Sequence, residues 1–329
     1  MKHLKKMLLI GILAIIILIS SCSRQDQASP NKEAQTLKGV SLSPKSFASE
    51  DFTNFFEKAK QSGSIVSWAG DWNELSNVQN GGPAVVAGLA SKYKYTPLII
   101  AQFFTQSSGQ LIRPLDDATK QKYKASAVSF AEKYKPEYLG LGIEVNMLYE
   151  KSPDEFEVFV DFYNEVYDAV KAASPKTKVF TIFQLERMKG LNGGLFGGVN
   201  DPKKQQWSLL EKFRSDIIAF TTYPGLVYKN PSEIPQDYYT EIKSHATKPI
   251  AFTEIGWHSD AGPKGWESSE KEQSEFIERF FSLTKGMNIR LAVWSFMYDQ
   301  DTIEPFKSMG LIYKDGMEKL AWEKWTTQN

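Results

Sequence analysis

Short apolar runs rich in β-branched and aromatic residues alternate with amphipathic stretches along most of the chain. Runs that are continuously apolar, rather than alternating, are typical of parallel strands buried on both faces. The sequence therefore predicts eight strands, at residues 39–42, 64–68, 97–103, 138–144, 178–183, 216–222, 249–254 and 289–296.

The amphipathic stretches between these runs predict helices, for example at 51–61, 117–134, 153–173 and 268–285. Two of them carry start signals, because Ser152 precedes a proline at the first helical position and Ser268 occupies an N-cap position. Eight strands followed by helices, with no internal linker or repeat, fit one (β/α)₈ barrel better than two doubly wound domains. We expect an α/β fold, a single TIM barrel, over residues 37–329.

The first residues have the pattern of an export signal. Three lysines within the first six residues precede an uncharged apolar run at 7–19, which is too short to span the hydrocarbon core of a bilayer. The run ends in Ile-Ser-Ser-Cys, which resembles a bacterial lipobox and implies cleavage before Cys22 and lipidation of its thiol. We expect a signal peptide at 1–21, a polar tether at 22–36 and a lipid-anchored domain in the bacterial cell envelope, outside the cytoplasm. The alternative is an uncleaved membrane anchor.

Charge and cysteine content narrow the possible partners. Lysine plus arginine equals aspartate plus glutamate, at 39 each, which gives no argument for nucleic-acid binding. The only cysteine is Cys22, so the exported domain has none for disulfides. The chain has 8 Trp, 14 Tyr and 21 Phe, side chains that fill cores and also stack on sugar rings. We expect a monomer that binds a neutral partner and needs no cofactor.

In barrel enzymes the chemistry lies at the carboxyl ends of the strands. Polar and aromatic residues gather at these ends in the predicted barrel. They are Trp68, Trp72, Gln102, Glu144, Asn146, Gln184, Tyr223, Glu254, Trp257 and Trp294. His258 is more simply a loop hydrogen-bonding group than a metal ligand, because no second histidine or acid lies at zinc spacing, and we predict no metal site.

Two of these residues are carboxylates, Glu144 after the fourth strand and Glu254 after the seventh. Retaining glycosidases use such a pair: one carboxylate attacks the anomeric carbon and the other protonates the leaving oxygen. Proximity would split the two pKa values and keep one group protonated near neutral pH. For each glutamate the alternative is a structural residue paired at a strand end.

The segments YLGLGIEVN and PIAFTEIGWHSDAG resemble the acid/base and nucleophile motifs of glycoside hydrolase clan A. The second segment and FTTYPG are most similar to the endo-1,3-β-glucanases of family 17, and next to the endo-β-1,4-galactanases. The resemblance implies that Glu254 is the nucleophile, Glu144 the acid/base, Tyr223 the hydroxyl that orients the nucleophile, and Trp294 the platform beneath the cleaved sugar. Packing inside the barrel is the alternative for Tyr223 and Trp294.

One residue departs from the clan pattern. Clan members carry asparagine before the acid/base, where its amide binds the sugar 2-hydroxyl, whereas this chain has Ile143. We consider Asn146 or Gln184 as replacements from a neighbouring position.

The interpretation is a lipid-anchored retaining endo-β-glycosidase that hydrolyses a β-glucan or related polysaccharide. Trp68 and Trp72, on a polar loop, are expected to be exposed and to stack on sugars, while Gln102 and Trp257 complete the binding residues. The alternatives are a non-catalytic carbohydrate-binding lipoprotein on a decayed barrel, which Ile143 favours, and a transglycosylase that uses the same residues.

Overall fold

The structure is a computed structural model that describes residues 36–260 and 262–328. The expected signal peptide, Cys22 and all of the tether but its last residue lie outside the described residues. Within the described part of the chain, no helix has both the length and the apolar character needed to cross a membrane.

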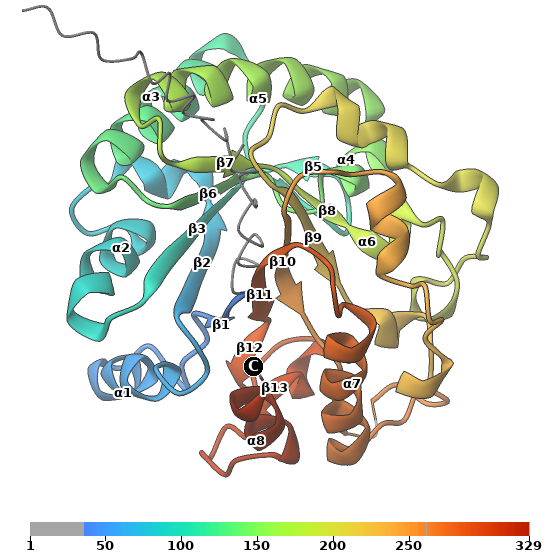
Figure 1. The fold of residues 1–329 in the computed structure, drawn as a ribbon. Helices are drawn as coiled ribbons and strands as arrows, with labels where there is room; N and C mark the ends of the chain where they lie inside the picture. Colours follow the sequence, from blue (N-terminus) through green and yellow to red (C-terminus); the bar gives the residue numbers. More distant parts are fainter. Residues whose placement is uncertain (1–35, 261, 329) are drawn as a thin grey trace, which may run out of the picture. The chain divides into compact units, whose positions relative to one another are not determined.

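Nine parallel strands form one sheet around the centre of the domain (Figure 1). Their order around the sheet is β7 (Lys178–Phe180), β6 (Tyr138–Leu141), β3 (Thr96–Gln102), β2 (Ile65–Asp71), β1 (Leu37–Ser41), β11 (Ile289–Trp294), β10 (Ile250–Ile255), β9 (Ile218–Thr222) and β8 (Ile182–Gln184). Two short pairs lie outside it, β4 (Phe104–Thr105) with β5 (Gln110–Leu111), and β12 (Phe296–Tyr298) with β13 (Gly310–Ile312).

The fifth predicted strand is interrupted at Thr181 and supplies both ends of the sheet. Its first part, β7, pairs with β6, and its second part, β8, pairs with β9. Two backbone hydrogen bonds complete the seam, from Ile182 N to the Gly142 carbonyl at 3.1 Å and from Asp216 N to the Val179 carbonyl at 2.9 Å. The sheet therefore closes on itself, and the predicted (β/α)₈ barrel is confirmed.

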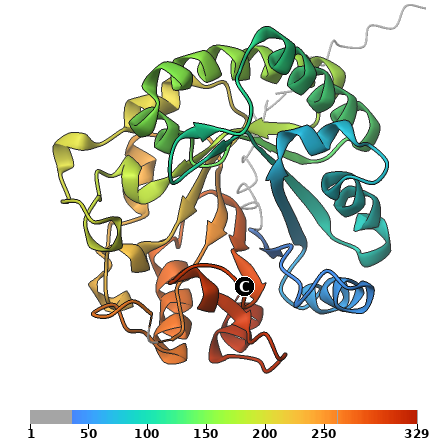
Figure 2. The ribbon, with the colours of Figure 1, turned by 180° about the vertical axis from the view of Figure 1, so that it is seen from behind.

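Helices surround the sheet, as both views show (Figures 1 and 2). They are α1 (Ser49–Ala59), α2 (Gly82–Tyr93), α3 (Asp117–Tyr134), α4 (Val145–Lys151), α5 (Pro153–Ala173), α6 (Leu185–Met188), α7 (Glu270–Leu283) and α8 (Leu320–Thr327). Ser269, not Ser268, caps α7, because its hydroxyl accepts from Glu272 N. Between β8 and β10 the connections contain 3₁₀ turns and the one-turn α6 in place of long helices.

The barrel interior changes from apolar to polar toward its carboxyl end. Leu98, Ile100, Ile182 and Leu291 belong to the apolar cluster that fills the barrel. Nearer the carboxyl ends of the strands, the residues that point into the barrel are small and carry hydroxyl groups. They are Ser41, Ser67, Thr221 and Ser295. The core thus ends below a floor of hydroxyl groups, which is where the candidate site begins.

Candidate active site

Glu144 lies in a tight turn that joins β6 to α4. The predicted strand through residue 144 is shorter than expected, since β6 ends at Leu141 and Gly142 follows with a φ of +86°. Glu144 is the residue before α4 and has a φ of +56°, in the left-handed region that few side chains other than asparagine adopt. Its Oε1 accepts a hydrogen bond of 2.6 Å from the Thr221 hydroxyl.

Glu254 follows an irregularity in β10. The register with β9 pairs Phe252 with Phe220 and then Glu254 with Thr221, so Thr253 is an extra residue in the ladder. Such bulges re-aim the side chains beside them. Glu254 Oε2 accepts a hydrogen bond of 2.5 Å from the Tyr223 hydroxyl, as the resemblance implied.

The Tyr223 ring is held in place from two sides. The Ser295 hydroxyl donates to Tyr223 Oη at 2.9 Å. On the other side the ring packs on Gly256, where a Cβ atom would lie 2.7 Å from the ring carbon Cε1. Glycine at this position therefore allows Tyr223 to reach Glu254.

Burial raises the pKa of both carboxyl groups. Burial and then the charge of Glu254 raise the pKa of Glu144 to about 8, while the Thr221 hydrogen bond opposes this shift. Burial also raises the pKa of Glu254, and the Tyr223 hydrogen bond favours its ionised form. At neutral pH Glu144 therefore holds a proton.

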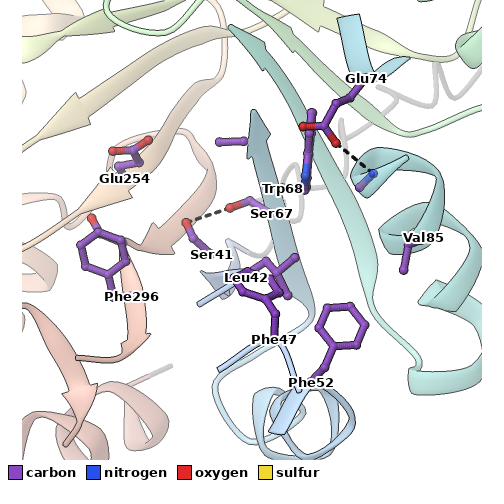
Figure 3. Close-up of a pocket in the computed structure, with 13 residues that line it drawn as sticks. Ser41, Leu42, Phe47, Phe52, Ser67, Trp68, Glu74, Val85, Glu254 and Phe296 are labelled. Carbon is purple, nitrogen blue, oxygen red and sulfur yellow. Dashed lines mark hydrogen bonds between the residues drawn. The ribbon is translucent and has the colours of Figure 1, made fainter. Parts of the chain in front are cut away.

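A cavity of about 490 Å³ opens beside Glu254 (Figure 3). Its floor carries the hydroxyls of Ser41, Ser67 and Ser295, the first two joined by a hydrogen bond of 2.9 Å. Apolar side chains form most of the remaining wall, namely Leu42, Phe47, Phe52, Trp68, Val85 and Phe296. The cavity thus offers aromatic faces and hydroxyl groups on the Glu254 side of the pair.

Of the four predicted tryptophans, Trp68 lines the cavity, but its expected place on an exposed loop is wrong, because it lies within β2 and is only 7% exposed (Figure 3). Trp72 does not, and its expected exposure is wrong: it is 0% exposed, stacks on Tyr123 and donates its indole N–H to the carbonyl of that residue at 3.0 Å. The short turn after β2 folds inward here, and a polar neighbourhood in sequence did not reveal this.

The other two tryptophans also serve the packing of the barrel. Trp257 is fully buried and bonds through its indole N–H to the Ser268 hydroxyl at 3.0 Å. Trp294 is fully buried and bonds to the Met309 carbonyl at 2.7 Å, so it is not the sugar platform that the resemblance implied. The aromatic side chain from this part of the chain that lines the cavity is Phe296, which the sequence argument missed.

The three predicted amide side chains hold loops together. Gln102 Nε2 donates to the Ile143 carbonyl at 3.1 Å, and Asn146 Nδ2 donates to the Gln184 carbonyl at 3.1 Å. Gln184 Oε1 accepts from Arg187 N at 2.7 Å. Neither Asn146 nor Gln184 replaces the missing asparagine, and Gln102 is not free to bind a sugar.

Ile143 itself belongs to the apolar cluster inside the barrel. The sequence also gave no prediction for the hydroxyl groups of Ser41, Ser67 and Ser295, which line the cavity. Side chains two positions beyond the inward-facing apolar residues of β1, β2 and β11 must point into the barrel as well, and this alternation would have predicted these hydroxyl groups.

Among residues 36–260 and 262–328, no group of three or more His, Cys, Asp or Glu side chains is arranged to hold a metal ion. His258 is a loop hydrogen-bonding group, as expected, because its Nε2 lies 2.7 Å from the Trp266 carbonyl.

The sequence matches no family model and no curated protein. Among solved structures, the chain is similar to a family 39 glycoside hydrolase from Bacteroides cellulosilyticus WH2, with a TM-score of 0.60 and 16% identity over 89% of this chain and 63% of that one. It is similar to GH5_18 from Streptomyces cattleya in complex with Manβ1-4GlcNAc, with a TM-score of 0.64 and 14% identity over 89% and 79%. It is also similar to a β-glucuronidase from Ruminococcus gnavus, with a TM-score of 0.57 and 14% identity over 89% and 50%. Likeness at these identities establishes the barrel fold.

Proposed function

We propose that this protein is a retaining β-glycosidase that uses Glu254 as nucleophile and Glu144 as acid and base. The observation that carries the proposal is the arrangement around β9, where Thr221 donates to one carboxylate and Tyr223 to the other. The raised pKa of Glu144 suits an acid that must be protonated at neutral pH. The named activities of the structural neighbours support the same reaction class.

The reaction would proceed in two displacements. In the first, Glu254 attacks the anomeric carbon while Glu144 gives its proton to the glycosidic oxygen, which leaves as an alcohol. In the second, Glu144 takes a proton from water, whose oxygen attacks the anomeric carbon and releases the Glu254 carboxylate. The sugar that becomes attached to Glu254 would occupy the cavity beside it, with Trp68 or Phe296 against its apolar face.

The finer features of the proposal rest on the sequence. The motif resemblance to families that cleave polysaccharides supports an endo-acting enzyme for a β-glucan or related glycan. The lipobox-like segment ending in Cys22 supports attachment to a membrane of the bacterial envelope, outside the cytoplasm. A transglycosylase would use the same residues and differ only in the acceptor.

The second candidate is a carbohydrate-binding protein without activity. It is favoured by Ile143, because the amides considered as substitutes for the clan asparagine are engaged in loop hydrogen bonds. Contacts to the sugar 2-hydroxyl strengthen in the transition state, so their loss affects catalysis more than binding.

A screen of β-1,3, β-1,4 and mixed-linkage glucans, galactans and mannans separates the candidates. Calorimetric titration and a reducing-end assay would be run on the same samples, with Glu254→Gln as the control variant. The proposal expects new reducing ends with the wild-type chain and none with the variant. Tight binding without cleavage would replace it by the binding function.

A further inference from the structure

A third carboxylate, Glu186, lies behind the pair and takes no part in the two displacements. It follows β8 in the single turn of α6, and its side chain is 0% exposed. Four hydrogen bonds reach it. Oε1 accepts from Thr222 Oγ1 at 3.0 Å, Tyr223 N at 3.0 Å and Tyr238 Oη at 2.7 Å, and Oε2 accepts from Gln184 Nε2 at 2.6 Å.

Burial raises the pKa of Glu186, whereas these hydrogen bonds oppose that rise and favour its ionised form. The backbone N–H of Tyr223 and the side-chain amide nitrogen of Gln184 can only donate, so a carboxylate that accepts on both oxygens satisfies them. A buried charge of this kind costs several kcal/mol unless its surroundings compensate it.

Glu186 contacts the end of β9 and the residue that follows it. Thr221 donates to Glu144 and Tyr223 donates to Glu254, so alternate residues face the site. Thr222, between them, faces the other way and donates to Glu186, as does the backbone N–H of Tyr223. Glu186 thus accepts hydrogen bonds from Thr222 and Tyr223, within a three-residue segment whose first and last side chains donate to Glu144 and Glu254.

We propose that Glu186 is a positioning residue of the active site, which fixes residues 221–223 so that the hydroxyls of Thr221 and Tyr223 meet Glu144 and Glu254. The inference rests on the proposed function, because it assigns Glu186 a role in that same reaction. Glu186 touches no substrate and acts through its neighbours.

The charge of Glu186 adds a second effect, since it contributes to the raised pKa of Glu144. The titratable and charged groups near Glu186 are Arg187 beside it, Tyr228, Tyr238 and Tyr239 from the connection after β9, and the catalytic Glu144. Arg187 acts on Glu144 in the opposite sense and also forms a 3.4 Å ion pair with Glu150. Removing the charge of Glu186 should therefore lower the pH at which Glu144 loses its proton.

Two substitutions separate the effect of the Glu186 charge from that of its hydrogen bonds to Thr222 and Tyr223. Glu186→Gln keeps the shape and removes the charge, so we expect the basic limb of the pH–rate profile to move to lower pH and kcat to fall about tenfold, with KM nearly unchanged. Glu186→Asp keeps the charge and withdraws the oxygen from Tyr223 N, so we expect a similar loss of kcat with the basic limb unmoved. If the glutamine variant does not fold, the kcat of the aspartate variant still tests the positioning role.

The matched control is Tyr238→Phe, which removes one donor to the same carboxylate oxygen and leaves Thr222 and Tyr223 in contact with it. We expect Tyr238→Phe to lose about as much thermal stability as the Glu186 variants. Its kcat and the basic limb of its pH–rate profile should stay close to those of the wild type. In a Tyr223→Phe background the effect of Glu186→Asp on kcat should shrink, because Glu186 positions Glu254 partly through the Tyr223 hydroxyl.

A titration of the Glu144 side-chain carboxyl by ¹³C NMR, without substrate, keeps this inference separate from the proposed function. It should show a lower pKa in Glu186→Gln than in the wild type, whether or not a glycoside is cleaved. A folded Glu186→Gln protein with an unchanged Glu144 titration, or folded Gln and Asp variants with kcat within about twofold of wild type, would overturn the proposal.

Discussion

The hydroxyl of Thr221 donates a 2.6 Å hydrogen bond to Glu144 Oε1. The same threonine is the register partner of Glu254 in the ladder between β9 and β10. A single strand position therefore ties the fourth-strand carboxylate to the backbone that carries the seventh-strand carboxylate. β9 therefore contacts the elements that carry both carboxylates.

The first prediction concerns pH. Because the pKa of Glu144 is raised to about 8 and the proposed acid must be protonated, kcat/KM should fall as the pH rises through about 8. The acid limb should report Glu254, which must be ionised to attack. The measurement is a pH–rate profile on any glycoside that the screen identifies. A rate that keeps rising beyond pH 9 would be incompatible with Glu144 as the acid.

The second prediction concerns the hydroxyl that orients the nucleophile. Tyr223→Phe removes the hydrogen bond that favours ionised Glu254, so its acid limb should move to higher pH and kcat should fall about 100-fold. Ser295→Ala removes the bonds from its hydroxyl to Tyr223 Oη and to the Ile255 carbonyl but leaves the bond from Tyr223 to Glu254, so kcat should fall less. Equal kinetic constants for Tyr223→Phe and wild type would show that this hydroxyl does not act on the reaction.

The third prediction concerns stability. The folded pKa of Glu144 is raised above its unfolded value, so its contribution to stability is fully present below about pH 4.5 and is lost as the pH rises through about 8. Glu144→Gln carries no such penalty and keeps an oxygen for Thr221. It should match wild type near pH 4 and exceed its free energy of unfolding by about 1–3 kcal/mol near pH 9. Denaturant titrations at the two pH values check this, and a variant less stable at pH 9 would contradict the assigned burial of the charge.

The fourth prediction contrasts two tryptophans close together in sequence. Trp68 lines the cavity, so Trp68→Ala should raise KM or weaken binding about tenfold. Trp72 is fully buried, so Trp72→Ala should cost about 3–5 kcal/mol of stability. Calorimetric binding and thermal unfolding of both variants provide the test. A Trp72→Ala protein that unfolds like wild type and binds poorly would reverse the assignment.

The strand pattern gave the barrel because parallel strands buried on both faces must be continuously apolar, and the eight runs met that condition. The strand-end rule placed Glu144, Tyr223 and Glu254 in the right region without showing their contacts. The rule failed for Trp72 and Trp294, because the sequence does not show whether a tryptophan at a strand end points into the active-site cavity or into the core. Local sequence also gave no sign of the break at Thr181 or of the bulge before Glu254, which depend on pairing with strands distant in sequence.

The most direct test of the central claim is to trap the covalent intermediate. A 2-deoxy-2-fluoro glycoside of the sugar that the screen identifies, with an activated leaving group, would be incubated with the wild-type chain and the peptides analysed by mass spectrometry. The account predicts one added fluoroglycosyl group on the peptide that contains Glu254, and none in Glu254→Gln. A label on another residue, or turnover of the natural substrate with inversion at the anomeric carbon, would contradict it.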